Sequence, residues 1–221
     1  MHLQRLLMVR DGYKFAVPPL LAALVALGLA FRWSGGALKF GALWTGAVLL
    51  FLAAFVAYFF RDPERAIPAD AALVVSPADG RVMEVVDESF GGRPGRRISI
   101  FLAIWNVHVN RSPMAGRIEQ IEYRPGRFYA AMRSRASEEN EQNVILLSTA
   151  RGDLVFKQIA GWVARRVVCW KKPGDQVGAG ERIGLIRFGS RMDVWLPEGV
   201  EILVAPGQHV AGGSSILARW T

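Results

Sequence analysis

Two long apolar segments open the chain, and their pattern predicts a helical hairpin. Phe15 to Phe31 holds 17 residues without a charge, and Phe40 to Phe60 holds 21 more. The second segment is long enough to span the core of a bilayer as a helix, and the first is at the lower limit. The linker from Arg32 to Lys39 has only eight residues. We therefore expect residues 1–60 to form a two-helix transmembrane hairpin that anchors the protein.

The residues in and around these segments support a membrane hairpin over a buried helical pair in a soluble protein. Leu, Ala, Phe and Val cover all faces of both segments, which is typical of a membrane span. Pro18 and Pro19 lie near the start of the first segment, where a helix needs no donated hydrogen bond. Basic residues are more frequent outside the hairpin than in its loop, which favours both ends on the cytoplasmic side of a cell membrane.

From Arg61 onward short apolar runs alternate with Gly, Pro and Asp, a spacing that predicts a mainly β domain over residues 61–221. Residues 61–70 are expected to be a proline-containing linker. One continuous strand is predicted from Ile98 to Asn110, because apolar and polar residues alternate along it. Ala130 to Asn140 is polar, and we expect a loop or a short helix there.

An internal repeat marks the C-terminal part of the chain. "PGDQVGAGERIG" begins at Pro173 and "PGQHVAGGSSIL" begins at Pro206, and both fit P-G-x-x-V-x-x-G-x-x-I. Each copy predicts two short strands separated by glycine turns. The repeat resembles the two halves of biotinyl and lipoyl carrier modules, which implies a barrel-sandwich element. No lysine follows Lys172, however, so a carrier that holds its cofactor on lysine is disfavoured.

Composition narrows the classes of function. The formal net charge is +8, which suits either nucleic acid or an anionic membrane surface, and the apolar segments favour membrane lipid over nucleic acid. The single cysteine, Cys169, excludes an internal disulfide and a cysteine-rich metal site. No P-loop, dinucleotide-binding fingerprint or H-E-x-x-H motif occurs. We expect no metal.

The stretch "LIRFGSRMDVWLP" places Gly189-Ser190 between two apolar runs that both predict strands. One interpretation is a glycine that eases a bend, since the chain contains a second such pair at Gly213-Ser214. The other is chemical. A serine hydroxyl can attack the carbonyl of the preceding residue, and glycine there leaves the carbonyl accessible and tolerates strained backbone. Elimination across the resulting ester and hydrolysis then leave a pyruvoyl group.

Two further residues are candidates for acid–base chemistry. His108 follows an apolar strand face and is flanked by Asn106 and Asn110, which suggests a site at the rim of a sheet. Asp79 lies in "SPADG", where a plain β-turn is the simplest interpretation. Arginines that could line a surface, meet anionic headgroups or hold a phosphate are Arg93, Arg96, Arg97, Arg124, Arg127, Arg133, Arg135, Arg165 and Arg166.

Several motifs together resemble the short, membrane-anchored phosphatidylserine decarboxylase proenzymes: "YFFRDPER", "SPADGRV", "NVHVNRSP", "ASEENEQN", "QIAGWVARRVVCWKKPGDQV" and "GERIGLIRFGSRMDVWLP". The resemblance implies self-cleavage between Gly189 and Ser190. Residues 1–189 become a β chain, and residues 190–221 become an α chain headed by a pyruvoyl cofactor made from Ser190. It implies decarboxylation of phosphatidylserine to phosphatidylethanolamine. It also assigns Asp79 and His108 to the catalytic set with Ser190.

The resemblance leaves three points open. Longer bacterial members carry a second histidine where this chain has Arg111, so the base for self-cleavage is not assigned. The lipid tails and the oligomeric state, including a homo-oligomer, are also not determined. Two alternatives remain: a non-catalytic membrane-anchored adaptor with a biotinyl-like barrel, and the same chemistry on a different serine lipid.

Overall fold

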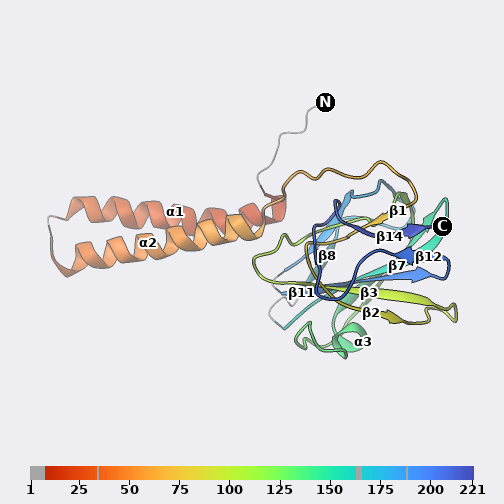
Figure 1. Cartoon of the computed structure of the whole chain (residues 1–221). Helices are drawn as coiled ribbons and strands as arrows, with labels where there is room; N and C mark the ends of the chain where they lie inside the picture. Colours follow the sequence, from red (N-terminus) through yellow and green to blue (C-terminus); the bar gives the residue numbers. More distant parts are fainter. Residues whose placement is uncertain (1–7, 34, 163–165, 188) are drawn as a thin grey trace. The chain divides into compact units, whose positions relative to one another are not determined.

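The computed structural model describes residues 8–33, 35–162, 166–187 and 189–221. Contacts divide the chain into two units, Met1–Pro63 and Glu64–Thr221, and Figure 1 shows the helical first unit and the β-rich second unit. The boundary falls in the segment expected to be a linker, which contains no strand from residue 62 to residue 72. Each unit is described by itself below.

The first unit is a hairpin of α1 (Arg10–Arg32) and α2 (Gly36–Phe59), as predicted. Both helices are long and apolar enough to cross a membrane, and only 17% of the most apolar stretch of each helix is buried. A core helix of a soluble protein would be mostly buried. The predicted position of Pro18 and Pro19 near a helix start was wrong, because α1 begins at Arg10 and both prolines lie inside it.

A glycine lets the two helices approach each other closely. A Cβ placed on Gly46 of α2 would lie 2.6 Å from the side chain of Leu27 on α1. Small residues at helix contacts are typical of membrane helices, where packing rather than water exclusion drives association. The described part of the hairpin therefore has an apolar outer surface and a tightly packed inner one.

The second unit is mainly β, as predicted, with three sheets whose strand orders are β13-β2-β3-β11-β7-β6-β5-β9, β1-β14-β12 and β4-β10-β8. The bounds of its elements are β1 (Leu73–Val75), β2 (Gly80–Asp87), β3 (Gly95–Leu102), β4 (Val109–Arg111), β5 (Gly116–Arg124), α3 (Ala136–Glu139), β6 (Gln142–Thr149), β7 (Gly152–Ile159), β8 (Val167–Cys169), β9 (Gln176–Val177), β10 (Arg182–Ile186), β11 (Ser190–Pro197), β12 (Val200–Ile202), β13 (His209–Val210) and β14 (Ile216–Trp220).

The C-terminal repeat forms matching structures. Gly174 and Gly207 both have φ of +93°, and each is followed by a two-residue strand, β9 and β13 respectively, at opposite edges of the large sheet. The second glycines, Gly180 and Gly213, also have positive φ, and β10 and β14 follow them as the middle strands of the two small sheets. The relation to biotinyl and lipoyl modules stays a prediction.

A second repeat that the sequence analysis missed accompanies the first. "SPADGR" after β1 and "SPMAGR" after β4 have the same internal bonds, since Ser76 Oγ donates to Ala78 O and Ser112 Oγ donates to Met114 O. The copies also exchange backbone bonds: Arg111 N donates to Pro77 O at 2.8 Å, and Val75 N donates to Pro113 O at 2.9 Å. The domain is thus built from two related, interlocked halves.

The predicted single strand from Ile98 to Asn110 was wrong. β3 ends at Leu102 and β4 begins at Val109. Asn106 causes the break, because its side chain accepts a hydrogen bond from Ala103 N at 2.8 Å while its own N–H donates to Ala103 O at 2.9 Å. Asparagine readily forms such local bonds in competition with a ladder. The short helix α3 is consistent with the prediction for residues 130–140.

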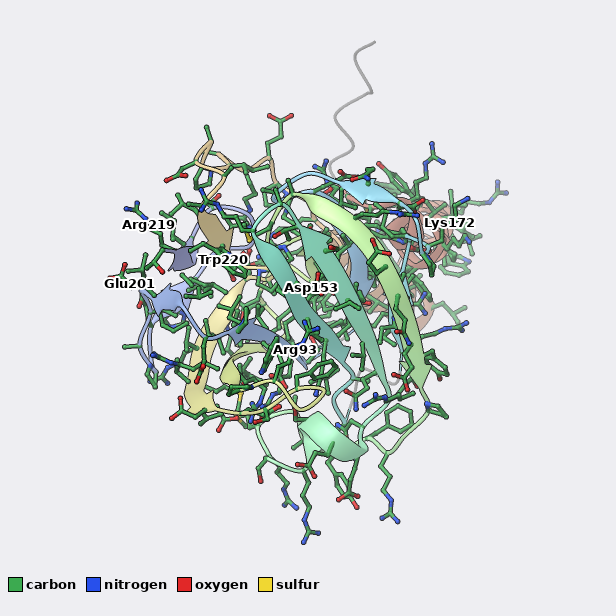
Figure 2. All side chains as sticks on the ribbon, turned by 90° about the vertical axis from the view of Figure 1, so that its right-hand side faces the viewer. Arg93, Asp153, Lys172, Glu201, Arg219 and Trp220 are labelled. Carbon is green, nitrogen blue, oxygen red and sulfur yellow. The ribbon has the colours of Figure 1, made fainter. Side chains whose placement is uncertain are left out.

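β11 is a central strand of the large sheet. It pairs with β3 from Ser190–Leu102 to Pro197–Gly95, and with β7 from Arg191–Ile159 to Trp195–Val155. Asp153, near the start of β7, lies at the opposite end of this sheet from Ser190. Figure 2 views the domain from that opposite end, where Asp153 and Arg93 form an ion pair of 3.6 Å.

We predict that residues 64–221 fold without the hairpin. All buried members of the main core cluster lie between Val74 and Ala218, and a domain of this size buries enough apolar surface to be stable alone. The purified fragment should show β-type circular dichroism and one cooperative thermal transition in buffer without detergent. A fragment that melts gradually, while the full chain in detergent unfolds cooperatively, would contradict this.

Candidate functional site

Gly189 and Ser190 lie where the chain passes from a small sheet into the large one. Gly189 has φ of +60°, in the left-handed region that favours glycine, and Ser190 is the first residue of β11, opposite Leu102 of β3. Ser190 is completely buried, and its Oγ has no hydrogen-bond partner among the described residues. An unpaired buried hydroxyl is costly, so this position is held for a reason other than stability.

The carbonyl group of Gly189 is packed against Gly161, which follows β7. A Cβ on Gly161 would lie 2.0 Å from Gly189 O, 3.0 Å from Gly189 C and 3.4 Å from Ala131 Cβ. Only glycine leaves room for this carbonyl. Gly161 lies within "QIAGW", and no local sequence pattern could have shown that it contacts Gly189, 28 residues further along the chain.

His108 is buried and has a defined ring orientation. Its Nδ1 lies 2.9 Å from Asn106 O, and a carbonyl can only accept, so Nδ1 carries a proton. In the neutral ring Nε2 is then the basic nitrogen. The turn at Ala103–Asn106 therefore both breaks the strand and fixes the tautomer of His108.

Backbone and side-chain bonds connect the region of His108 to both sides of Ser190. His108 O accepts a bond of 3.3 Å from Ile186 N, four residues before Ser190. Asn110, two residues after His108, accepts a bond of 2.8 Å at its Oδ1 from Gln158 Nε2. Gln158 in turn pairs with Met192, which lies two residues after Ser190 in β11.

Gln158 belongs to a polar row that sequence reasoning missed. Its Oε1 also accepts a bond of 3.0 Å from Asn143 Nδ2, so Asn143, Gln158 and Asn110 form a buried chain on the apolar side of the sheet. The available signal was an amide side chain within an otherwise largely apolar run, Asn143 in "QNVILL" and Gln158 in "VFKQIAG".

Asp79 is not joined to His108 or Ser190 by any contact between described side chains. Its carboxylate accepts two bonds from Arg65 Nη2, at 2.7 and 2.8 Å, and one of 2.8 Å from Gly212 N. Its loop does meet β4, which directly follows His108, through the bond from Arg111 N to Pro77 O. Arg65 comes from "RDPER" at the start of this unit, and sequence reasoning gave it no role.

Arg111, which stands where longer relatives are expected to have histidine, is a buried structural residue. Its Nη1 donates to Gly180 O at 3.0 Å, and its Cδ lies against Gly213. The arginine thereby connects the two glycine turns of the repeat. Its guanidinium stays protonated at neutral pH and is unsuited to the role of a general base.

A buried charged cluster occupies the other face of the sheet, immediately after Ser190. Arg191 is fully buried and donates to Asp193 at 2.6 Å, to Ser99 at 2.7 Å and to Glu84 at 2.9 Å. Arg97 also binds Glu84. Burial alone would raise the pKa of Glu84, but hydrogen bonds and charge from Arg97 and Arg191 outweigh burial, so this pKa lies below its usual value.

The other candidates contribute less. His209 is exposed on β13. Cys169 is partly buried, and this burial raises the pKa of its thiol, so it is not a reactive thiolate. Within the described residues no three His, Cys, Asp or Glu side chains gather as a metal site. Of the arginines named above, Arg165 lies outside the described residues.

Comparison with known proteins gives two matches. The model of the phosphatidylserine decarboxylase family matches residues 52–218. A phosphatidylserine decarboxylase proenzyme from Solibacter usitatus (strain Ellin6076) is 49% identical over 197 residues, which cover 89% of this chain and 91% of the relative. The match includes Gly161, Gly189 and Ser190, together with His108 and Asp79.

If the chain cleaves itself between Gly189 and Ser190, as its motif predicts, Gly161→Ala should slow that cleavage by about 100-fold, the usual cost of moving a reacting group by an ångström. The new methyl group must displace the Gly189 carbonyl. The measurement is the fraction of cleaved chain over time by gel electrophoresis. Gly178→Ala is the matched control, because its Cβ would meet only Glu181 Oε2, at 3.8 Å. Wild-type cleavage in a folded Gly161→Ala protein would show that the close contact is irrelevant.

Proposed function

The chain belongs to the phosphatidylserine decarboxylase family, and from this premise we propose that Ser190 cleaves its own chain and becomes the catalytic group. Membership makes the protein a decarboxylase of phospholipid synthesis with phosphatidylserine as the substrate of its family. The relative's name also calls it a proenzyme. The finer proposal is cleavage into residues 1–189 and 190–221, with a pyruvoyl group at position 190.

The observation that carries the proposal is the buried Oγ of Ser190, which has no hydrogen-bond partner among the described residues and follows a glycine whose carbonyl packs against a second glycine. Gly189 has φ of +60° and no side chain, and Gly161 leaves room on the other side of the carbonyl. The second Gly-Ser pair, Gly213-Ser214, also has a positive φ at glycine, but Ser214 is only partly buried and lies in a repeat turn. Positive φ alone therefore does not define the site.

Self-cleavage balances without an external oxidant or reductant. Ser190 Oγ attacks Gly189 C, loses its proton to a base, and forms an ester as the peptide C–N bond breaks and the nitrogen takes a proton. Loss of the Ser190 α-proton then breaks the Cβ–O bond and releases residues 1–189 with a free carboxylate. Water finally replaces the nitrogen, which leaves as ammonia, and the ketone of a pyruvoyl group remains at position 190.

His108 is the proposed acid–base residue. Its Nδ1 proton is held by Asn106 O, so Nε2 can accept or return a proton. Decarboxylation requires a proton at the carbon that loses carbon dioxide, and a buried imidazole suits this transfer. The pyruvoyl group, once formed, supplies the electron-accepting carbonyl that the protein side chains lack.

The catalytic role of Asp79 and the choice of a base for self-cleavage are both inferred from the family resemblance. The described contacts of Asp79 are with Arg65 and Gly212, so its part in the chemistry is proposed through an intervening water or through its loop. Arg111 is excluded as the base by its permanent charge. His108, three residues before Arg111, is then the candidate for proton transfer in both self-cleavage and decarboxylation.

The helical hairpin is proposed to hold the decarboxylase domain at the cytoplasmic face of the cell membrane. Both helices meet the length and composition needed to cross a bilayer. Arg10 and Lys14 precede the first apolar span and Arg61 follows the second, while the loop between the spans carries Arg32 and Lys39. This bias follows the usual excess of basic residues on the cytoplasmic side.

Ser190→Ala tests the function directly. The wild-type protein is expected as two fragments, residues 1–189 and 190–221, of which the smaller lacks a free amino terminus, whereas the variant stays a single chain and releases no carbon dioxide from phosphatidylserine. Intact-mass spectrometry and a carbon dioxide assay measure both. Ser214→Ala is the control and should be cleaved normally. A folded wild-type protein that stays intact would instead support a non-catalytic anchored module.

His108→Ala should lower decarboxylation by about 100-fold or more, the usual contribution of a positioned acid–base group. Self-cleavage is scored separately by mass, because loss of both reactions assigns both proton transfers to His108, and loss of turnover alone assigns a different base to cleavage. His209→Ala, on the exposed strand β13, should retain both reactions. Normal turnover in cleaved His108→Ala would exclude the assignment.

A further inference from the structure

Three loops of the β domain meet at Gly189 and Ser190. The first, residues 103–106, continues from Leu102, which pairs with Ser190. The second, residues 160–162, contains Gly161, which packs on the Gly189 carbonyl. The third, residues 130–135, contributes Ala131, whose Cβ faces Gly161. Contacts between described residues therefore put all three loops around Gly189 and Ser190.

Each of these loops exposes at least one large apolar side chain. Trp105 is 64% exposed and Ile104 41%, Met132 is 63% exposed beside buried Ala131, and Trp162 is 69% exposed beside buried Gly161. We call Ile104, Trp105, Met132 and Trp162 the apolar rim. Such a group of exposed apolar side chains on separate loops usually marks an interaction surface.

Positive charge accompanies the apolar rim. Arg133 and Arg135 follow Met132 and are exposed, and Arg166 is the first described residue after Trp162 and is also exposed. Among the described residues none of these three arginines has an ion-pair partner. Indole rings prefer the boundary between hydrocarbon and headgroups, and exposed arginines are attracted to anionic headgroups.

We propose that the apolar rim inserts into the surface of an anionic bilayer and seats the mouth of the Ser190 site on the headgroups. This partner rests on the proposed function, because the family substrate is a lipid whose tails stay in the bilayer while its head must reach a completely buried residue. A rim of exposed apolar side chains beside three arginines that have no ion-pair partner among the described residues matches this surface in both hydrophobicity and charge.

The rim also links docking to the chemistry. Trp105 lies in the turn whose Asn106 breaks the strand and orients the His108 ring. Trp162 directly follows the glycine that contacts the carbonyl of the bond to be cut. Seating the rim thus fixes, at the bilayer, the same two loops that shape the site.

The test measures immersion of the rim in the full-length chain. Nitroxide labels are attached, in a Cys169→Ala and Ser190→Ala background, to Trp105→Cys or Trp162→Cys, and the protein is reconstituted in vesicles of phosphatidylcholine with phosphatidylglycerol. Leu203→Cys is the matched control. Leu203 is 44% exposed and directly follows β12, which pairs with β14. Trp220 of β14 lies against Gly152 in the β6–β7 turn, at the end of the large sheet opposite Ser190. The readout is the accessibility of each label to oxygen and to a water-soluble nickel chelate.

Labels at positions 105 and 162 should be several-fold more accessible to oxygen relative to nickel than the label at position 203. Arg133→Gln with Arg135→Gln should reduce that difference. Equal nickel accessibility at all three positions would overturn the proposal. Dipolar broadening between labels on two chains would also overturn it, because a second copy would then cover the rim. Because the Ser190→Ala background needs neither cleavage nor turnover, these results are independent of whether the proposed function holds.

Discussion

The site depends on the burial of β11 on both faces. Ser190 and Met192 point toward the apolar core, while Arg191 and Asp193 point to the opposite face and are equally buried. A buried arginine is costly unless its charge is paired, and Asp193, Glu84 and Ser99 accept hydrogen bonds from Nε and Nη2 of Arg191. Side chains alternate along a strand, so a shift of β11 by one residue would drive Arg191 into the core. The charged cluster therefore sets the register that keeps Ser190 inside.

The sequence predicted those features that depend on local pattern. Two uncharged apolar segments predicted the helical hairpin, and the spacing of glycines predicted the repeat turns at Gly174 and Gly207. The extended motif around Ser190 indicated the family. Local pattern misplaced the end of β3, because alternation continues through Asn106 although its side chain breaks the ladder. Alternation also could not show that Arg191 would be buried, since both faces of β11 are covered by distant segments.

Contacts between distant positions could not be read from the sequence at all. Gly161 matters because of Gly189, and Arg65 matters because of Asp79, but nothing within either motif identifies the other. The duplicated "SPxxGR" turn was visible in principle. It was missed because its two copies lie in different regions from the glycine repeat, and only their exchange of bonds through Pro77 and Pro113 shows that the repeats belong to the same two halves. The position of Asp79 in the first copy is occupied by Ala115 in the second. The two halves therefore share the turn structure, but only the first has a carboxylate at this position.

The central position of β11 has a consequence for the lifetime of the protein. If the bond before Ser190 is cut, residues 190–221 remain held through ladders to β3 and β7 and through β14 between β1 and β12. Folding of the uncut precursor is unimolecular, whereas a mature molecule that once unfolds must find its separated C-terminal peptide again. Refolding then becomes concentration-dependent and competes with aggregation. The mature protein is therefore expected to persist through a slow unfolding rate rather than through a reversible equilibrium, and each molecule has one opportunity to fold.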